Sequence, residues 1–504
     1  MNDSKLSSKI TAVSTGVAGF DGILDGGYAS NRVHLIEGQP GTGKTTLALQ
    51  FLLDGAAQGE RCLYITLSES KEELEQVAET HGWNLGGIEI FELVPAELSL
   101  DPKQQQTVVY ASDLELGETT KMTFDELIRV APARVVFDSL SEIRLLAQNP
   151  LRYRRQVIAL KHFLAQQGCT SLFLDDLTDQ GDDLNLHSLA HGVVRLEHYA
   201  LQYGAERRRL RIFKMRGRNF RGGFHDFVIR KGGIALFPRL IAAEHADGGI
   251  VADPLLSNIA EQDQLLGGGL DRGTSTLLTG PSGSGKSSLA MQFVIAALDR
   301  GERALFVTFD ETKAIFTKRA AGMGWQLERP ITTGQLILEQ VDPAELSPGE
   351  LTGMLRRRVE AENVRIVVLD SLSGYQNAMP AEQFMLLLMH EMLTYLNHRG
   401  VVTILTLAQH GLVGSMQSSV DLTYLSDTVL LLRFFEAAGK IRRAISVLKK
   451  RTGRHEDEIR EYQLDGIGIR VGPPLSEFQG VLSGSPTFTG PHGSLLTATA
   501  NGRS

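Results

Sequence analysis

The sequence predicts an α/β protein of two tandem domains, in each of which a mostly parallel sheet is flanked by helices. Three observations support this prediction. Short apolar runs alternate with longer amphipathic segments, as buried parallel strands and their crossover helices require. A glycine-rich motif that follows such a run occurs twice. The two copies keep one spacing over much of the chain, which indicates a duplicated domain.

The first glycine-rich motif is Gly38–Thr45, which fits the G-x-x-x-x-G-K-[ST] pattern of a phosphate-binding loop. The apolar run Val33–Ile36 predicts a strand before it, and Leu47–Leu53 predicts a helix after it, with its N-terminus directed at the phosphates. The glycines let backbone N–H groups face an anion. Lys44 supplies a positive charge for the β- and γ-phosphates, and the Thr45 hydroxyl can ligate Mg²⁺.

The second copy is Gly280–Ser287, between the predicted strand Thr276–Leu278 and the predicted helix Leu289–Val294. Two matches in the same strand–loop–helix context favour nucleotide binding over a glycine-rich surface turn. The loop residues that we expect to bind ATP are Gly38, Gly41, Thr42, Gly43, Lys44, Thr45 and Thr46 in the first copy, and Gly280, Gly283, Ser284, Gly285, Lys286, Ser287 and Ser288 in the second.

The repeat extends beyond the loops. The two loop lysines are 286 − 44 = 242 positions apart, and at the same offset His81–Trp83 matches Met323–Trp325. A polar, glycine-bearing stretch near Glu244–Gly249 predicts the boundary. The predicted parts are domains 1–246 and 247–483, and a flexible tail 484–504 rich in Ser, Thr, Gly and Pro.

Apolar runs place further strands in both copies. In the first copy they are Cys62–Ile65, Val135–Phe137 and Ser171–Leu174, and in the second Ala304–Val307, Ile366–Leu369 and Val402–Leu405. The helices that we expect between them include Arg152–Gln166 and Gln383–Asn397.

Composition narrows the class of protein. The 504 residues are 42% hydrophobic and carry a net charge of −8, which argues against a surface that broadly coats nucleic acid. The two cysteines, Cys62 and Cys169, form no C-x-x-C pair, so a disulfide framework or a thiolate zinc site is not supported. The start is polar, and no run of about 18 apolar residues occurs. We therefore expect a cytoplasmic protein that does not enter a membrane.

Each copy also has an aspartate at the end of a buried strand, where a phosphate-binding loop needs an acidic partner for Mg²⁺. Asp138 and Asp370 both precede Ser-Leu-Ser. A lone aspartate there would commonly cap a strand-to-helix turn, but the recurrence favours the metal role. The predicted Mg²⁺ ligands are Thr45, Asp138, Ser287, Asp310 and Asp370.

Hydrolysis requires a group that orients or deprotonates the attacking water. The candidate catalytic residues are Glu69 in the first copy and Asp310 and Glu311 in the second, each just after an apolar strand. The alternative is that this position only begins a helix, for which Ser68 or Ser70 would be a good N-cap. Since one copy has two carboxylates and the other has one, we expect the two sites to differ in rate or reaction.

A cationic group that stabilises the transferring phosphoryl can come from a neighbouring subunit. Near the end of each copy an apolar strand leads into Lys-x-Arg, and an arginine lies six positions before the lysine (214 − 208 and 449 − 443). The alternative is that these basic residues only form a solvated rim at the ends of the strands. Their recurrence at matching positions in both copies argues against this alternative. The predicted ATP-binding residues here are Arg208, Lys214, Met215, Arg216, Arg443, Lys449, Lys450 and Arg451.

With these motifs duplicated, the chain resembles the KaiC family, the circadian-clock ATPases and autokinases with two RecA-like P-loop domains. The resemblance covers roughly residues 14–486 and is specific in Asp427–Leu432, Arg443–Ile445 and Ser483–Thr487. It implies a homohexameric ring with ATP at subunit interfaces and the Lys-x-Arg acting on a neighbour's ATP. It also implies a first domain that hydrolyses ATP and a second that phosphorylates an adjacent Ser-Thr pair.

Two positions depart from the family pattern. The family's paired glutamates become Ser68-Glu69 in the first copy and Asp310-Glu311 in the second, so the first copy lacks the member that the family uses as base. The family's Ser-Thr pair aligns with Thr423-Tyr424, and Thr423 is therefore the implied phosphoacceptor.

Three functions are left open by the sequence. The first is an ATP-hydrolysing, autophosphorylating hexamer that signals to KaiB-like or other proteins. The second is a RecA/DnaB-like DNA-dependent ATPase; the acidic balance and the lack of an aromatic-and-basic single-strand channel signature argue against it. The third is a scaffold in which ATP only cements the ring.

Overall fold

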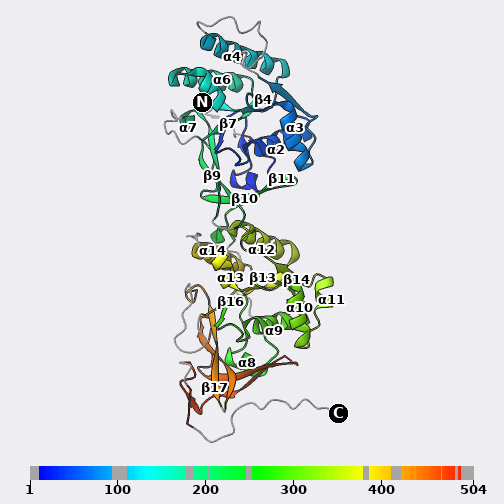
Figure 1. Cartoon of the computed structure of the whole chain (residues 1–504), viewed down its shortest axis with the longest axis vertical. Coiled ribbons are helices and arrows are strands. Elements are labelled where there is room, and N and C mark those ends of the chain that lie inside the picture. Colours follow the sequence, from blue (N-terminus) through cyan, green and yellow to red (C-terminus); the bar gives the residue numbers. More distant parts are fainter. Residues whose placement is uncertain are drawn as a thin grey trace, which may run out of the picture. The chain divides into compact units, whose positions relative to one another are not determined.

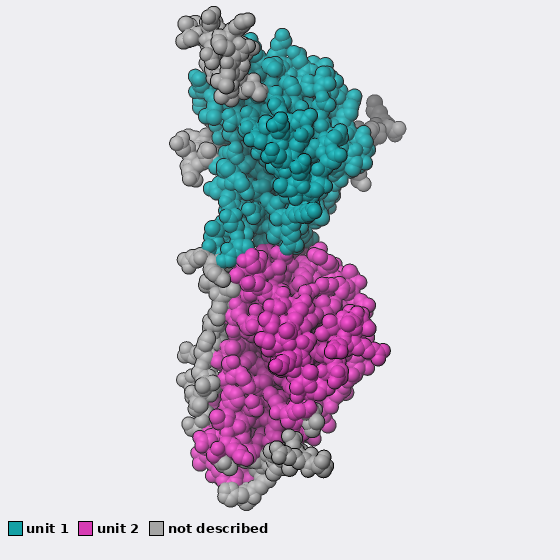
Figure 2. Space-filling view, turned by 45° about the vertical axis from the view of Figure 1, so that its right-hand side comes forward, with its two compact units in different colours: residues 1–239 teal, residues 240–504 magenta. Residues whose placement is uncertain are grey.

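The computed structural model describes residues 11–93, 111–177, 186–201, 204–245, 253–378, 385–409, 422–437, 439–466, 468–482 and 486–489, with the helix positions 111–115 and 377–378 described by their backbone alone. The chain divides into two compact units, Met1–Arg239 and Leu240–Ser504 (Figure 2). Leu240 and Ala242 belong to the second unit because they pack in its core with Tyr395 and Leu396. The division therefore falls a few residues before the boundary predicted at residue 246.

The first unit is built on a nine-stranded sheet with the order β11-β10-β9-β8-β3-β7-β6-β4-β5. Figure 1 labels β4, β7, β9, β10 and β11 of this sheet. The strands from β8 to β5 in this order run parallel, and β9, β10 and β11 form an antiparallel extension. The strands are β3 (Val33–Gly38), β4 (Cys62–Thr66), β5 (Ile88–Glu92), β6 (Arg134–Asp138), β7 (Thr170–Asp176), β8 (Gly192–Tyr199), β9 (Arg207–Met215), β10 (Phe224–Arg230) and β11 (Gly233–Phe237), with a separate pair β1 (Ala12–Val13) and β2 (Tyr28–Ala29).

Helices cover both faces of this sheet. Successive residues of β3 point to opposite faces: Ile36 packs with Leu47 and Phe51 of the helix after the loop, and Leu35 packs with Leu160 on the other face. The helices are α1 (Phe20–Ile23), α2 (Lys44–Ala57), α3 (Lys71–His81), α4 (Ala111–Val130), α5 (Leu140–Ala147), α6 (Pro150–Gln166) and α7 (Leu186–Leu189).

The second unit repeats this plan, with the sheet order β14-β13-β15-β16-β12-β17-β18-β19-β20. Its strands are β12 (Ser275–Gly280), β13 (Arg303–Thr308), β14 (Leu336–Gln340), β15 (Val364–Asp370), β16 (Val402–Ala408), β17 (Thr428–Ala437), β18 (Lys440–Lys450), β19 (Ile459–Asp465) and β20 (Gly468–Pro474), with the pair β21 (Phe478–Gln479) and β22 (Thr487–Phe488). Its helices are η2 (Ala242–His245), α8 (Ala260–Leu265), α9 (Lys286–Asp299), α10 (Lys313–Gly322), α11 (Glu328–Thr332), α12 (Pro348–Glu362), α13 (Leu372–Ala378) and α14 (Met385–His398).

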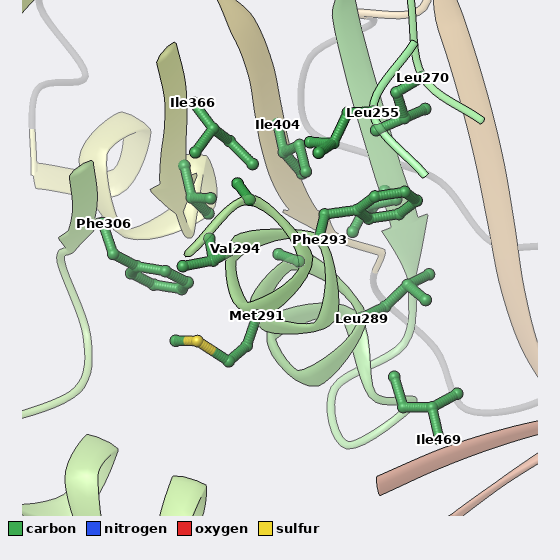
Figure 3. Packing of buried hydrophobic residues seen from close by; sticks show 14 of the residues in the cluster. Leu255, Leu270, Leu289, Met291, Phe293, Val294, Phe306, Ile366, Ile404 and Ile469 are labelled. Atoms are coloured by element: carbon green, nitrogen blue, oxygen red, sulfur yellow. The ribbon is translucent and has the colours of Figure 1, made fainter. Parts of the chain in front are cut away.

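Helix α9 lies at the centre of a hydrophobic core of the second unit (Figure 3). Phe293 and Val294 of α9 are fully buried, together with Phe306 of β13, Ile366 of β15 and Ile404 of β16. Burying a phenylalanine or valine side chain contributes about 1.5–3 kcal/mol each. This packing fixes the helix that follows the second loop against its sheet.

The predicted fold class is confirmed, because each unit is a mostly parallel sheet between layers of helices. Each strand predicted from an apolar run is a strand of one of the two large sheets. The first two residues of the predicted helix Gln383–Asn397 and most of the predicted tail lie outside the described residues. Among the described residues, no helix is long and apolar enough to cross a membrane.

Candidate active sites

The first phosphate-binding loop lies at the carboxyl edge of its sheet, where β3 ends at Gly38 and α2 begins at Lys44. Gly43 has a φ of 100° and a Cβ there would lie 2.6 Å from Ile229 Cδ1, so only glycine fits. The Lys44 Nζ donates to the carbonyl oxygens of Gly38 at 2.9 Å and Gln39 at 3.0 Å. It also forms an ion pair with Asp176 Oδ1 at 2.7 Å.

The second loop has the same backbone course. Gly285 has a φ of 100°, and α9 begins at Lys286. The Lys286 Nζ donates to the carbonyls of Gly280 at 2.9 Å and Pro281 at 2.8 Å. Burial lowers the pKa of Lys286 to about 8, and the negative charge of Asp370 partly opposes this decrease. A phosphate beside this lysine would favour its charged form.

The strand-end aspartates are buried and hydrogen-bonded. Asp138 Oδ2 accepts from the Tyr64 hydroxyl at 2.5 Å, and that hydroxyl accepts a hydrogen bond from Thr45. Burial raises the pKa of Asp138, and the Tyr64 hydrogen bond opposes this rise. The first unit thus connects its loop threonine to its aspartate through a tyrosine.

In the second unit the loop serine reaches the aspartate directly. Asp370 Oδ1 accepts from Thr406 Oγ1 at 2.5 Å, and its carboxylate also accepts from Ser287. Burial raises the pKa of Asp370, and both hydrogen bonds lower it. No group of three or more His, Cys, Asp or Glu side chains is arranged around a metal in the described parts of the chain. A hydroxyl and one carboxylate fit Mg²⁺, which commonly takes few protein ligands and completes its shell with phosphates and water.

Glu69 follows β4 at the same edge of the first sheet. Its Oε2 is buried and meets no hydrogen-bond partner within the described residues. Burial raises the pKa of Glu69 to about 7, with further rises from the charges of Asp138, Glu73 and Asp176, while Lys44 lowers it. A carboxyl with a pKa near the working pH suits a general base.

Helix capping does not explain Glu69 or its counterparts. Ser70 is the N-cap of α3, with its side chain and that of Glu73 forming a capping box, and Thr312 caps α10. The carboxylates Glu69 and Glu311 directly precede these caps. The helix N-caps are therefore the neighbouring hydroxyl residues Ser70 and Thr312, and the carboxylates of Glu69 and Glu311 do not cap these helices.

The two carboxylates of the second unit have different surroundings. Glu311 accepts two hydrogen bonds from Arg319, at 3.1 Å from Nε and 2.7 Å from Nη2. Asp310 is exposed, and its Oδ2 accepts a hydrogen bond from Ser371 Oγ at 2.7 Å. Ser371 directly follows Asp370 in the chain. Arg319 matches Val77 of the first unit (319 − 242 = 77), so Glu69 has no such guanidinium from its own helix.

The predicted Lys-x-Arg residues of the first unit lie at the opposite edge of the sheet from the loop. Lys214 pairs with Val193, the second residue of β8, whereas the loop begins beside Leu196, in the half of that strand nearer its carboxyl end. The Lys214 Nζ donates to Ala190 O at 2.9 Å, and Arg216 Nη2 donates to Ser188 O at 2.7 Å. Met215 ends β9 at this same edge.

The second unit shows the same separation. Lys449 and Lys450 pair with the first residues of β17, and Lys449 Nζ donates to the carbonyls of Thr423 and Ser426, both at 2.7 Å. Arg451 Nη2 donates to Tyr424 O at 2.7 Å. The structure therefore does not bring the Lys-x-Arg residues to the phosphate-binding loop of their own chain.

The upstream arginines behave differently from the Lys-x-Arg. Arg208 pairs with His198 of β8, and Arg443 pairs with Phe434 of β17, so both lie toward the loop edge of their sheets. Arg443 stacks on Phe434, whose ring approaches the second loop near Gly283.

Thr423 is exposed and lies just before β17, at the edge away from the second loop. β12 crosses the sheet between the two edges with six residues, a span of roughly 17–20 Å. Thr423 therefore does not lie near the second loop of its own chain.

Sequence reasoning missed several residues at these sites. Tyr64, Arg319, Asp176 and Thr406 contact predicted site residues. Arg144 holds the buried Asp175 with two hydrogen bonds of 3.0 and 2.7 Å. The pair Asp175-Asp176 carried a usable signal, because it directly follows the predicted strand Ser171–Leu174 at the ligand-binding edge of the sheet. The Tyr64 and Arg319 contacts depend on tertiary packing.

Two RecA-like P-loop domains, each with a loop lysine, a loop hydroxyl and a strand-end aspartate, define the class of tandem P-loop ATPases. The chain belongs to the KaiC family within this class: the family model described as "ATPase: KaiC" matches residues 13–241 and 256–476. Proteins of this family bind nucleotide and are generally hexameric.

Named relatives align with nearly the whole chain. The circadian clock protein KaiC3 of Synechocystis sp. is 25% identical over 488 residues, covering 95% of this chain and 95% of its own. The circadian clock oscillator protein KaiC of Thermostichus vulcanus is 26% identical over 487 residues, covering 95% and 93%. The KaiC of Prochlorococcus marinus subsp. pastoris is 26% identical over 496 residues, covering 96% of each chain. The chain is a distant, full-length homologue of cyanobacterial KaiC proteins.

Proposed function

We propose that this KaiC-family ATPase is a cytoplasmic homohexameric switch whose first domain hydrolyses ATP and whose second domain phosphorylates Thr423 of a neighbouring copy. The observation that carries the proposal is the division of each site between two edges. One edge has the loop lysine and the strand-end aspartate, and the other has the Lys-x-Arg and, in the second unit, Thr423. A second copy can bring the two edges together.

At the first site Glu69 takes a proton from the attacking water. The water oxygen forms a bond to the γ-phosphorus while the bond from that phosphorus to the β,γ-bridging oxygen breaks, giving ADP and phosphate. Lys44 holds the β- and γ-phosphates, and Thr45 and Asp138 would hold Mg²⁺, which would supply positive charge to offset that of the phosphates. The raised pKa of Glu69 lets it accept a proton near neutral pH.

At the second site Asp310 takes the proton of the incoming Thr423 hydroxyl. The Thr423 oxygen forms a bond to the γ-phosphorus and ADP leaves, so the phosphate passes to protein and not to water. The bidentate hold of Arg319 on Glu311 supports this division of roles, because it leaves Asp310 as the carboxylate beside Asp370. Asp310 is also proposed to contribute to Mg²⁺ binding.

The proposal is tested by mapping phosphosites after the purified chain is incubated with ATP and Mg²⁺, with ATP turnover measured in parallel. We expect phosphate on Thr423 in the unmodified chain and its loss in Lys286→Ala, with turnover at the first site retained. Full incorporation in Lys286→Ala, or labelling of Thr423→Ala as strong as that of the unmodified chain, would contradict the kinase assignment. ATP turnover without incorporated phosphate would leave only the ATPase. The phosphorylated state is proposed to be read by a KaiB-like or other signalling protein.

One observation favours the DNA-dependent ATPase as a second candidate. Arginines and aromatic rings alternate on one face of β9 and β10. The Cζ of Arg211 lies 4.2 Å from the centre of the Phe213 ring, and the Cζ of Arg209 lies 3.9 Å from the centre of the Phe224 ring. Such a face can stack bases and track a backbone. However, Glu197 pairs with Arg209 at 2.9 Å, which reduces the positive charge. Stimulation of ATP turnover by single-stranded DNA, abolished in Arg211→Ala, would favour this candidate.

A further inference from the structure

The strand position beside the first phosphate-binding loop is an aspartate, whereas the equivalent position beside the second loop is an alanine. In the first unit Gly38, where the loop begins, pairs across the sheet with Asp176, the last residue of β7. In the second unit Gly280 pairs in the same way with Ala408, the last residue of β16. The two registers make Asp176 and Ala408 equivalent positions. A carboxylate therefore lies beside the first loop where the second has a methyl group.

Both oxygens of this carboxylate are engaged. Asp176 Oδ1 lies 2.7 Å from Lys44 Nζ, and Oδ2 accepts from Ser141 Oγ at 3.2 Å. The Lys44 side chain is only 8% exposed and that of Asp176 is 33% exposed, so the pair is partly shielded from water. In the second unit the equivalent Ser373 instead accepts the backbone N–H of Ala408 at 3.0 Å.

The ion pair between Asp176 and Lys44 engages the positive charge that would bind the phosphates of the nucleotide. The loop lysine of a P-loop protein binds the β- and γ-phosphates, so Lys44 must exchange Asp176 for a phosphate when ATP binds. Within the described residues Lys286 donates only to loop carbonyls and has no carboxylate partner at this distance. Among the residues that the structure describes, the second lysine therefore has no ion pair of this kind to break.

We propose that Asp176 competes with the γ-phosphate for Lys44, so that the first site binds ATP more weakly and exchanges nucleotide faster than it would with the alanine of the second site. Once displaced, the carboxylate remains close to the phosphates and repels them. When the γ-phosphate leaves, Asp176 re-forms its pair with Lys44 and ADP loses one of its contacts. This inference rests on the proposed use of the first loop as an ATP site.

The test uses the full-length chain with Lys286→Ala, so that only the first loop binds nucleotide, titrated with the fluorescent analogue mant-ATP and Mg²⁺. Asp176→Ala installs the second unit's residue, and Asp176→Asn keeps the shape and removes the charge. We expect both variants to bind about tenfold more tightly, a factor that corresponds to about 1.4 kcal/mol. Stopped-flow release of mant-ADP should slow in both.

A reciprocal variant provides the matched control. In the full-length chain with Lys44→Ala, Ala408→Asp places a carboxylate beside Lys286 and should weaken mant-ATP binding at the second loop by a similar factor. Affinity that is unchanged or weaker in both Asp176→Asn and Asp176→Ala would overturn the inference alone. No mant-ATP binding by the Lys286→Ala chain would overturn the proposed use of the first site as well.

Discussion

The pH dependence of ATP hydrolysis at the first site follows from the environment of Glu69. Burial is the largest cause of its raised pKa of about 7, and the charges of Asp138, Glu73 and Asp176 add to it. A base must be deprotonated to act, so activity should be lost as the pH falls through 7. With that pKa about half of the chains carry the active carboxylate at pH 7, about one tenth at pH 6 and about nine tenths at pH 8.

The assay is release of phosphate by the Lys286→Ala chain between pH 5.5 and 8.5, where only the first site turns over. Glu69→Gln is the matched control, because it keeps the shape of the side chain and removes the base. We expect it to lower turnover by roughly 10²- to 10⁴-fold and to remove the acid limb. A profile that is flat from pH 6 to 8, or a Glu69→Gln chain with full turnover, would refute the assignment of Glu69 as base.

Two further predictions concern residues that contact the site carboxylates. Arg319→Val installs the residue of the first unit and should free Glu311 to act on water. Hydrolysis at the second site should then rise several-fold, measured in a chain in which Lys44 is replaced. An unchanged rate would contradict this prediction. Tyr64→Phe should lower the free energy of unfolding by about 1–2 kcal/mol, because buried Asp138 loses a hydrogen bond. The second unit has Phe306 at this position (306 − 242 = 64), so the ring should fit, and an unchanged urea midpoint would argue against the hydrogen bond's contribution.

Much of the fold could be predicted because its signals are local. Continuous apolar runs such as Ile366–Leu369 marked buried strands, and the repeat fixed the plan of one unit from that of the other. The loops at Lys44 and Lys286 were recognisable because their function needs glycines at fixed spacing.

The contacts that distinguish the two sites were not predictable in the same way. The pair between Lys44 and Asp176 joins residues 132 positions apart (176 − 44), and it exists because β3 and β7 are neighbours in the sheet. The arginine–aromatic face of β9 and β10 likewise needs a register that apolar periodicity does not give. Arg211 and Phe224 lie 13 positions apart (224 − 211) and meet only across strands, so the linear sequence shows no aromatic-and-basic single-strand channel signature.

Whether each active site is completed by a second copy is tested most directly by mixing two inactive chains. Lys286→Ala keeps the acceptor threonine and loses the second loop's lysine, whereas Thr423→Ala keeps the loop and loses the acceptor. The two chains, distinguished by a mass tag, are assembled together and incubated with ATP and Mg²⁺. We predict that phosphate reappears on Thr423 of the Lys286→Ala chain. A mixture that stays unlabelled, although it forms mixed assemblies and the unmodified chain is labelled, would contradict transfer between subunits.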